Sequence, residues 1–351
     1  MRLNDDVAEN QRLTRWAELL PRAPGQVGGV HETDAELVPL GDGRLLALTV
    51  DTVSEEIALG LYPDPRTAGR IAVAAAVSDL AAVGAEPIGL LLSVTLPARD
   101  ADAIQESVAR GVAEGASAAG TFVLGGDTNE GAALSIGCSA AGLVPAGPRL
   151  TRMGIRPGER VYVTGPLGLG AAWAAAALLK DPSILTEEEF RPPSRLAYGR
   201  ELRGVASAAM DTSDGLLATL DQLTRLNGVA IRLTCDASEL LHPAAVAAAR
   251  ATSLPPLALL GVPHGEFELA FAVPACRLHA LEKAAGRLGW TPLEIGVAEE
   301  GTGLFAGARR LDGARLRNLT SECGGDLRAW TRGLRDLLPA QASLSSSARR
   351  A

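Results

Sequence analysis

Apolar residues along the chain alternate between helical spacing and short continuous runs. Asp64-Pro65 supplies a helix N-cap and a proline at the first helical position, and small apolar residues then recur at helical spacing as far as Gly84. This pattern predicts a largely buried helix over 64–84, with Asp79 about four turns from its start. A carboxylate among small apolar neighbours is unfavourable unless it is paired or bound to a metal, so Asp79 requires a partner.

Other apolar patterns define the elements around this helix. Residues 13–20 have the spacing of an amphipathic helix that ends at Pro21, and we expect it to pack on the first domain. The run from Arg44 to Val53 is continuous and rich in β-branched residues, which predicts a buried strand that carries Asp51. Further elements are a helix from Asp100 to Ala119 and strands over 88–96, 121–124 and 134–144, with Gly125-Gly126-Asp127-Thr128 following the strand over 121–124.

The segment from Pro145 to Pro157 is rich in proline, glycine and arginine and predicts a domain boundary. We expect one domain over 1–148, a second over 149–337, and a disordered Ser- and Ala-rich tail over 338–351. Helix and strand patterns alternate with irregular spacing, so the chain is α/β (α+β), and its sheets are mixed or parallel. In the second domain, strands are predicted over 160–164, 229–234, 267–273 and 293–297, and helices over 170–179, 215–226 and 275–288.

Composition excludes several classes of function. The 351 residues are 47% apolar and carry a net charge of −8, which argues against a nucleic-acid surface because phosphate backbones need clustered basic residues. Lys180 and Lys283 are the only lysines, so a Walker-type phosphate loop is excluded. We expect no secretory signal, since Asp5, Asp6 and Glu9 precede the first apolar run, and no run reaches membrane-spanning length. The four cysteines lack C-x-x-C spacing, which favours a reducing, cytoplasmic setting with most of them in the core.

Five aspartates lie at or near predicted strand or helix ends, beside Thr, Ser or Gly. They are Asp51, Asp79, Asp127, Asp211 and Asp214. Hard cations such as Mg²⁺ prefer several carboxylate and hydroxyl oxygens together with substrate phosphates, so this distribution is typical of a site that holds several magnesium ions. Taken singly, each aspartate has a simpler role: Asp214 before Gly215 could cap a helix, and Asp127 could close a turn.

Several short motifs follow one another over about Gly29 to Val273. They are Thr49 to Thr52, Asp64-Pro65, Ser78 to Pro87, Gly125 to Thr128, Leu150-Thr151-Arg152, Pro157-Gly158, Val161 to Gly165, Arg191-Pro192 and Asp211 to Leu216. In this order they resemble the thiamine-monophosphate kinase family of the AIR synthase-like superfamily. The resemblance implies two AIR synthase-like domains with mixed sheets packed with helices, and a homodimer formed by the N-terminal domains. It also implies ATP and Mg²⁺ as cofactors, a small-molecule substrate, and neither nucleic acid nor membrane as a partner.

The resemblance also assigns roles to individual residues. It implies catalytic roles for Asp79, Asp127 and Asp214, and metal binding by Asp34, Asp51, Asp79, Asp127 and Asp214. It implies nucleotide binding by Asp51, Thr52, Gly125, Gly126, Thr128, Arg152, Asp211 and Ser213. From the residues themselves, arginines such as Arg152 can pair with phosphate in a bidentate manner, or can be ordinary surface residues.

Three loops depart from the family pattern. Glu32-Thr33-Asp34 replaces Gly-Asp-Asp, Pro263 to Leu269 replaces Gly-Gly-Glu-Asp-Tyr-Glu-Leu, and Leu169 stands where an acid is expected. These changes suggest an altered substrate or a weakened metal site. Residues in or near these loops become candidate substrate contacts, with a solvated histidine or a buried tryptophan as the simpler alternative, and they are His31, His264, Glu266 and Trp330. The turn Gly165 to Gly170 could hold a phosphate at a helix N-terminus, although such turns are common without one.

These observations favour an ATP- and Mg²⁺-dependent phosphotransferase that acts on thiamine monophosphate or a related anionic small molecule. The substrate phosphate would itself be the nucleophile, so an all-aspartate site suffices without a strong general base. One alternative is AIR synthase-type chemistry, in which ATP activates an amide for cyclisation or C–N bond formation and free phosphate is released. Another alternative is a nucleotide-binding relative without turnover, which the three altered loops favour.

Overall fold

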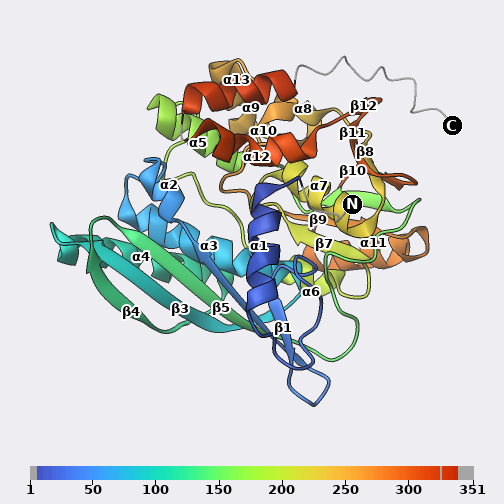
Figure 1. Ribbon diagram of the computed structural model, residues 1–351, viewed down its shortest axis with the longest axis horizontal. Helices are drawn as coiled ribbons and strands as arrows, with labels where there is room; N and C mark the ends of the chain where they lie inside the picture. The colour runs from blue at the N-terminus through green and yellow to red at the C-terminus, as the bar shows by residue number, and fades with distance from the viewer. Residues whose placement is uncertain (1–5, 325, 339–351) are drawn as a thin grey trace.

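Two mixed β-sheets, each with its own helices, form the core of the molecule (Figure 1). The computed structural model describes residues 6–324 and 326–338, so nearly all of the tail predicted over 338–351 lies outside the described residues. The first sheet has the order β1-β2-β5-β3-β4, with only β3 and β4 parallel. Its strands are β1 (Glu36–Pro39), β2 (Leu45–Thr52), β3 (Glu86–Pro97), β4 (Val123–Gly131) and β5 (Ser135–Val144).

The second sheet has the order β12-β11-β8-β10-β6-β9-β7, with only β8 and β11 parallel. Its strands are β6 (Arg160–Val163), β7 (Ala208–Asp211), β8 (Ala230–Leu233), β9 (Leu269–Val273), β10 (Leu293–Glu299), β11 (Gly303–Ala306) and β12 (Arg309–Arg310). Both sheets therefore combine parallel and antiparallel pairs, which confirms the predicted mixed α/β architecture.

Helices cover these sheets and join the two halves of the chain. In the first half they are α1 (Ala8–Leu19), α2 (Ser54–Ala58), α3 (Pro65–Ala82) and α4 (Ala101–Ala119). In the second half they are α5 (Leu169–Leu179), α6 (Leu196–Leu202), α7 (Leu216–Asn227), α8 (Ala237–Leu240), α9 (Pro243–Thr252), α10 (Pro256–Leu259), the 3₁₀ turn η1 (Ala275–Arg277), α11 (Leu278–Leu288), α12 (Gly313–Cys323) and α13 (Leu327–Leu337).

The central helix is α3, which begins as predicted. The Asp64 carboxylate accepts a hydrogen bond of 2.9 Å from the Arg66 backbone amide, and Pro65 occupies the first helical position. Small side chains let α3 approach other elements closely on several sides, and it packs on α4 and the first sheet as well as on α6 and β7 of the second half. At one crossing, Gly111 of α4 lies directly against the Arg66 carbonyl group. Thus α3 is buried by both halves.

One face of the first sheet packs against α3, and the other exposes apolar side chains. Along β2 the residues alternate, so that Leu45 and Ala47 pack beneath α3 while Leu48 and Val50 point outward, with Val50 65% exposed. We call this surface the outer face. Its exposed apolar residues are Leu48, Val50, Ile88, Leu91, Phe122 and Leu124. A contiguous apolar surface of this kind is unusual on a free monomer and indicates a binding surface.

Two predictions about local structure were wrong. The sequence Gly125 to Thr128 does not follow a strand but lies inside β4, because it continues the parallel ladder with β3. Helix α1 was expected to pack on the first domain, yet its N-terminal end is fixed to the second half. The buried Asn10 donates a hydrogen bond of 2.9 Å to Gln222 and accepts one of 3.0 Å from Arg317, because a buried amide needs polar partners.

Several smaller features complete the fold. The elements that were not predicted are strands β1, β7, β11 and β12 and helices α2, α6, α8, α9, α10, α12 and α13. The cysteines are all free. Cys138 is fully buried, Cys235 and Cys323 are partly buried and pack against the core, and Cys276 is exposed, so the core placement expected for most of them is confirmed. Within the described residues, no helix combines the length and the apolar character that a membrane span requires.

Candidate active site: an acidic cluster between the two halves

Three carboxylates from distant parts of the chain converge in the interior. Oxygens of Asp34, Asp79 and Asp211 lie within 4.8 Å of one another. Asp34 precedes β1, Asp79 lies on α3, and Asp211 ends β7. Since the first two belong to the first half and Asp211 to the second, this acidic cluster exists only because the two halves pack together.

Hydroxyl groups and one arginine hold these carboxylates in place. The Thr49 hydroxyl donates a hydrogen bond to Asp79, and the Ser78 hydroxyl donates one to Asp211. The Asp34 side chain is fully buried, and its Oδ1 accepts hydrogen bonds of 3.0 Å from Arg152 and 3.3 Å from the Asp211 backbone amide. Its other oxygen, Oδ2, is buried and has no hydrogen-bond partner among the described residues. This buried oxygen is therefore available to bind a cation.

The electrostatics of the cluster favour a bound cation. Burial, together with the charges of Asp51, Asp211 and Asp34, holds the pKa of Asp79 well above its ordinary range. Burial and the charge of Asp34 raise the pKa of Asp211 to about 7. Asp51 lies beside Asp79, and its buried Oδ2 also lacks a hydrogen-bond partner among the residues described. Crowded carboxylates with unsatisfied oxygens match the hard, oxygen-rich coordination of Mg²⁺, so these residues fit that ion.

Other predicted site residues lie at the margin of the cluster. Asp214 is exposed in the turn before α7, where its charge raises the pKa values of Asp51 and Glu9. Ser213 donates a hydrogen bond of 3.1 Å to Asp211. A groove of about 1010 Å³ runs from the cluster along α1 to the outer face, and it is lined by Glu9, His31, Asp34, Asp51, Asp79 and Arg152 together with outer-face residues.

Asp127 does not join the cluster. It lies on the edge strand β4, and strands β3 and β5 separate it from β2, a span of about 14 Å at normal strand spacing. Its register neighbours are Ser93, Gly137 and Thr52, in a row that points to the outer face and not toward Asp51. The neighbouring residues Gly125, Gly126 and Thr128 lie on the same exposed strand. Within one chain, these predicted ligands cannot share an ion with Asp79.

Arg152 lies against the acidic cluster and lines the groove, and its buried Nε has no hydrogen-bond partner among the described residues. Its guanidinium pairs with Asp34, and its backbone amide donates a hydrogen bond of 2.9 Å to the Glu32 carbonyl oxygen. The arginine therefore holds the loop over 31–34 against the linker between the halves and supplies one positive charge to the cluster.

The turn Gly165 to Gly170 also differs from the phosphate cradle considered from sequence. Its amide donors point at a carboxylate of the protein, because Glu266 accepts a hydrogen bond from the Gly168 backbone amide at the start of α5. Burial, followed by the charge of Glu268, raises the pKa of Glu266 to about 8. Arg195 compensates Glu268 through a buried bidentate ion pair. Glu266 is thus a structural residue of the turn.

This burial of Glu266 predicts a pH dependence of stability. The folded protein keeps the proton of Glu266 up to about pH 8, whereas an unfolded chain releases it near its ordinary pKa of 4.5. The free energy of unfolding should therefore fall as the pH rises from 5 to 8. In Glu266→Gln, whose amide oxygen can still accept the Gly168 hydrogen bond, the fall should be smaller. Melting temperatures measured across this range check the difference, and identical slopes for both proteins would contradict it.

The candidate substrate residues occupy different surroundings. His31 lines the groove, has a left-handed backbone with φ of 70°, and lies 3.3 Å from the Thr14 hydroxyl. His264 is buried beside Tyr62, and burial lowers its pKa to about 4, so it is neutral. Trp330 lines a cavity of about 140 Å³, the Trp330 pocket, together with Leu59, Leu61, Leu178, Val262, His264, Leu327 and the acids Glu55, Glu56 and Asp326.

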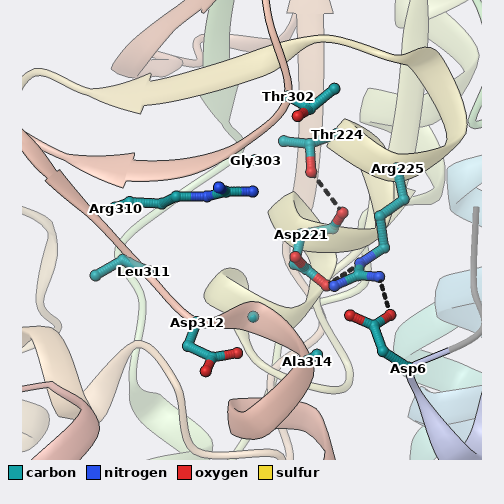
Figure 2. Close-up of a pocket in the computed structure, with 11 residues that line it drawn as sticks. Asp6, Asp221, Thr224, Arg225, Thr302, Gly303, Arg310, Leu311, Asp312 and Ala314 are labelled. Carbon is teal, nitrogen blue, oxygen red and sulfur yellow. Dashed lines mark hydrogen bonds and ion pairs between the residues drawn. The ribbon is translucent and has the colours of Figure 1, made fainter.

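A separate surface cavity, of about 540 Å³, lies over α7 and the start of α12 (Figure 2). Its deepest charges pair with one another, since Arg225 binds both Asp221 and Asp6. Asp221 is 3% exposed, so its carboxylate is paired with Arg225 and shielded from a ligand in the cavity. The cavity therefore does not compete with the acidic cluster as a candidate active site.

Two residues near the site, Thr49 and Glu56, were not predicted as site residues. Thr49 was recognised only as part of a motif, although its hydroxyl binds Asp79. Glu56 was not considered, yet it lines the Trp330 pocket and lies close enough to Asp51 and Asp214 for their charges to raise its pKa. The only signal in the sequence was a pair of adjacent acids four and five residues after Asp51.

Comparison with known proteins places this geometry in context. Residues 32–144 match the family model described as AIR synthase related protein, N-terminal domain. A thiamine-monophosphate kinase of Escherichia coli (strain K12) is 34% identical over 265 residues, which cover 73% of this chain and 79% of that protein. A thiamine-monophosphate kinase of Halobacterium salinarum is 33% identical over 83% of this chain and 94% of its own length. A solved structure, AaThiL complexed with AMPPCP and TMP, shares the fold at 23% identity, with a TM-score of 0.73 over 89% of this chain and 97% of that one.

Proposed function

Since the chain belongs to the thiamine-monophosphate kinase family, we propose that it transfers the γ-phosphoryl group of ATP to thiamine monophosphate, giving thiamine diphosphate and ADP. The family is the one predicted from the motifs. The observation that carries the proposal is the acidic cluster between the halves. Asp34 of the cluster and the neighbouring Asp51 each have a buried carboxylate oxygen that no described residue binds. Such a site suits phosphoryl transfer, which depends on positioning and charge neutralisation.

We propose Asp34, Asp79 and Asp211 as the ligands of Mg²⁺, with Asp51 beside them. Asp214, at the exposed margin, would face the nucleotide phosphates with Ser213. When bound, the ion neutralises phosphate charge and orients the two substrates. Thr49 and Ser78 fix the orientation of two of the carboxylates, and Arg152 fixes a third. A terminal phosphate oxygen of thiamine monophosphate attacks the γ-phosphorus as the bond to ADP breaks, and no protein base is needed.

The Trp330 pocket is the proposed site for the ring system of the substrate. Its walls combine a part-buried tryptophan with aliphatic side chains, and Leu59, Leu178 and Leu327 are 41%, 39% and 39% exposed. Exposed apolar groups of this kind suit a flat heteroaromatic ligand. His264 would contribute shape to the pocket because it is neutral, while Glu266 acts only through the turn that it supports. His31 remains a candidate contact in the groove.

The experiment that tests this function is incubation with ATP, Mg²⁺ and thiamine monophosphate, with all products identified by mass spectrometry. Formation of ADP and thiamine diphosphate in equal amounts is the expected result. Release of free phosphate without thiamine diphosphate would instead favour amide-activating chemistry, and the absence of any ATP turnover would favour a nucleotide-binding protein without catalysis.

We further propose that two copies pair through their outer faces. The support is the apolar surface around Val50, Leu91, Phe122 and Leu124. Pairing would also give a role to Asp127, which points to this face and cannot reach the cluster of its own chain. In the proposed dimer, Asp127 and the exposed Thr52 act at the groove that the two copies share, whereas Thr128 is beside Val94 in the ladder and points to the opposite face of the sheet. ATP as a substrate, together with free cysteines, suits the cytoplasm.

A substitution in the outer face tests this pairing. Val50→Arg should convert the dimer into a monomer, because it places a charge in the centre of an apolar contact. Light scattering coupled to gel filtration measures the change, and we expect kinase activity to fall with the dimer. Leu179→Arg, at an exposed apolar position at the end of α5, is the control and should leave the mass unchanged. A monomeric wild-type protein would contradict the proposal.

A further inference from the structure

The Trp330 pocket is lined by negative charge alone. Glu55, Glu56 and Asp326 are its charged lining residues, and no lysine or arginine is among the described residues that form its wall. The imidazole of His264 carries no charge near neutral pH because burial lowers its pKa to about 4. Asp326 is engaged as the N-cap of α13, since it accepts hydrogen bonds from the Arg328 and Ala329 amides, whereas Glu55 and Glu56 have no ion-pair partner among the described residues. A pocket that combines an aromatic ring with two such carboxylates favours a cationic ligand, through both cation–π and Coulomb attraction.

Among these acids, Glu56 has a distinctive position. It follows β2 on α2, and its backbone carbonyl accepts a hydrogen bond of 2.9 Å from the Leu61 amide, which ties α2 to the pocket wall. Its carboxylate has no ion-pair partner among the described residues. Burial, then the charges of Glu55, Asp51 and Asp214, raise its pKa. Glu56 therefore lies between the acidic cluster at one end and the apolar pocket at the other.

This position matches the chemistry of the proposed substrate. Thiamine monophosphate has an anionic phosphate at one end, a permanently cationic thiazolium ring, and a neutral aminopyrimidine. With the phosphate at the acidic cluster and a ring against Trp330, the fixed positive charge would lie next to Glu56. No protonation of the ring is involved near neutral pH, because the quaternary thiazolium nitrogen carries its charge without a proton.

We propose that Glu56 is a specificity-determining residue that recognises the fixed positive charge of the substrate ring system. This inference rests on the proposed function, since it assumes that the ring of thiamine monophosphate enters the Trp330 pocket. It assigns to Glu56 no part in the transfer of the phosphoryl group. Its effect should therefore appear in substrate affinity and in the choice between charged and neutral substrates.

The test compares thiamine monophosphate with an analogue whose thiazolium is replaced by a neutral thiophene ring. Dissociation constants for both are measured by calorimetry, without ATP, for the wild type, Glu56→Gln and Glu56→Asp. A partly buried ion pair is worth about tenfold in affinity, so the wild type should prefer the cationic ligand by about that factor. The preference should nearly disappear in Glu56→Gln, and Glu56→Asp, which keeps the charge, should retain most of it.

The matched control is Glu282→Gln, which removes a carboxylate from the exposed surface of α11 and should leave the preference intact. Melting temperatures confirm that the variants fold. An undiminished preference in Glu56→Gln overturns the inference, and so does a wild type that binds both ligands equally. Failure of the proposed function is seen separately, as the absence of thiamine diphosphate when ATP and Mg²⁺ are added to the wild type.

Discussion

Replacing Asp79 by asparagine should abolish kinase activity while leaving the protein folded. Asp79 is the proposed metal ligand that α3 contributes to the acidic cluster. Even residues that only support metal ligands are worth about 10- to 100-fold in activity, so loss of a direct ligand should exceed about a hundredfold. A coupled assay for ADP release measures the effect.

The same substitution should not reduce thermal stability in the absence of Mg²⁺. Neighbouring carboxylates and burial already raise the pKa of Asp79, so a neutral amide removes repulsion from Asp51 and Asp211. Wild-type protein should melt at a higher temperature when Mg²⁺ is added, because a ligand that binds only the folded state stabilises it, and the variant should lose this increase. Asp102→Asn, on the exposed side of α4, is the matched control. Full activity in Asp79→Asn would disprove the metal-ligand role.

Gly111→Ala is expected to have the second largest effect. A Cβ atom at Gly111 would lie 1.8 Å from the Arg66 carbonyl oxygen and 2.7 Å from its carbonyl carbon, and both are backbone atoms that cannot rotate away. Helices α3 and α4 must then separate, at a loss of about 1–3 kcal/mol in the free energy of unfolding. Since α3 carries Asp79, a weaker response to Mg²⁺ should accompany the lower melting temperature.

Gly286→Ala, in contrast, should raise the free energy of unfolding. Gly286 also lies inside a helix, α11, but no atom lies within 4 Å of the position that its Cβ would take. Alanine is the better helix former, so this variant should be more stable by about 0.5–1 kcal/mol. Denaturant unfolding of both variants measures the two shifts. Equal shifts would mean that the contact between α3 and α4 does not constrain Gly111.

Much of the secondary structure could be predicted because its signals are local. Asp64-Pro65 fixes the start of α3, and the apolar run from Leu45 to Thr52 forms β2 as expected. The short elements α8, α10, β11 and β12 were missed, since segments of two to four residues carry too little periodicity to be recognised. The Gly125 to Thr128 segment was misread as a turn because its glycines suggest one, whereas the ladder with β3 extends the strand through it.

The site was predicted in part. Asp79 and Asp211 were identified from the residues themselves, and Asp34 only through the family resemblance. The partners of other side chains could not be predicted from the sequence. Arg152 pairs with Asp34. The backbone amide of Gly168 in the Gly-rich turn donates a hydrogen bond to Glu266, which lies almost a hundred positions further along the chain. Glu56 lies near Trp330 because α2 and α13, which are far apart in the sequence, line the same pocket.

By itself, the sequence determined the elements, the mixed α/β class and the inventory of acids, because helix and strand periods and side-chain chemistry are properties of short segments. Only the tertiary structure decided which acids meet. Asp34 and Asp79 reach Asp211 because α3 is packed between the two halves, whereas Asp127 is turned away by the order of strands in the first sheet. Strand order and the contact between halves depend on the packing of residues far apart in the chain, and no local pattern encodes that packing.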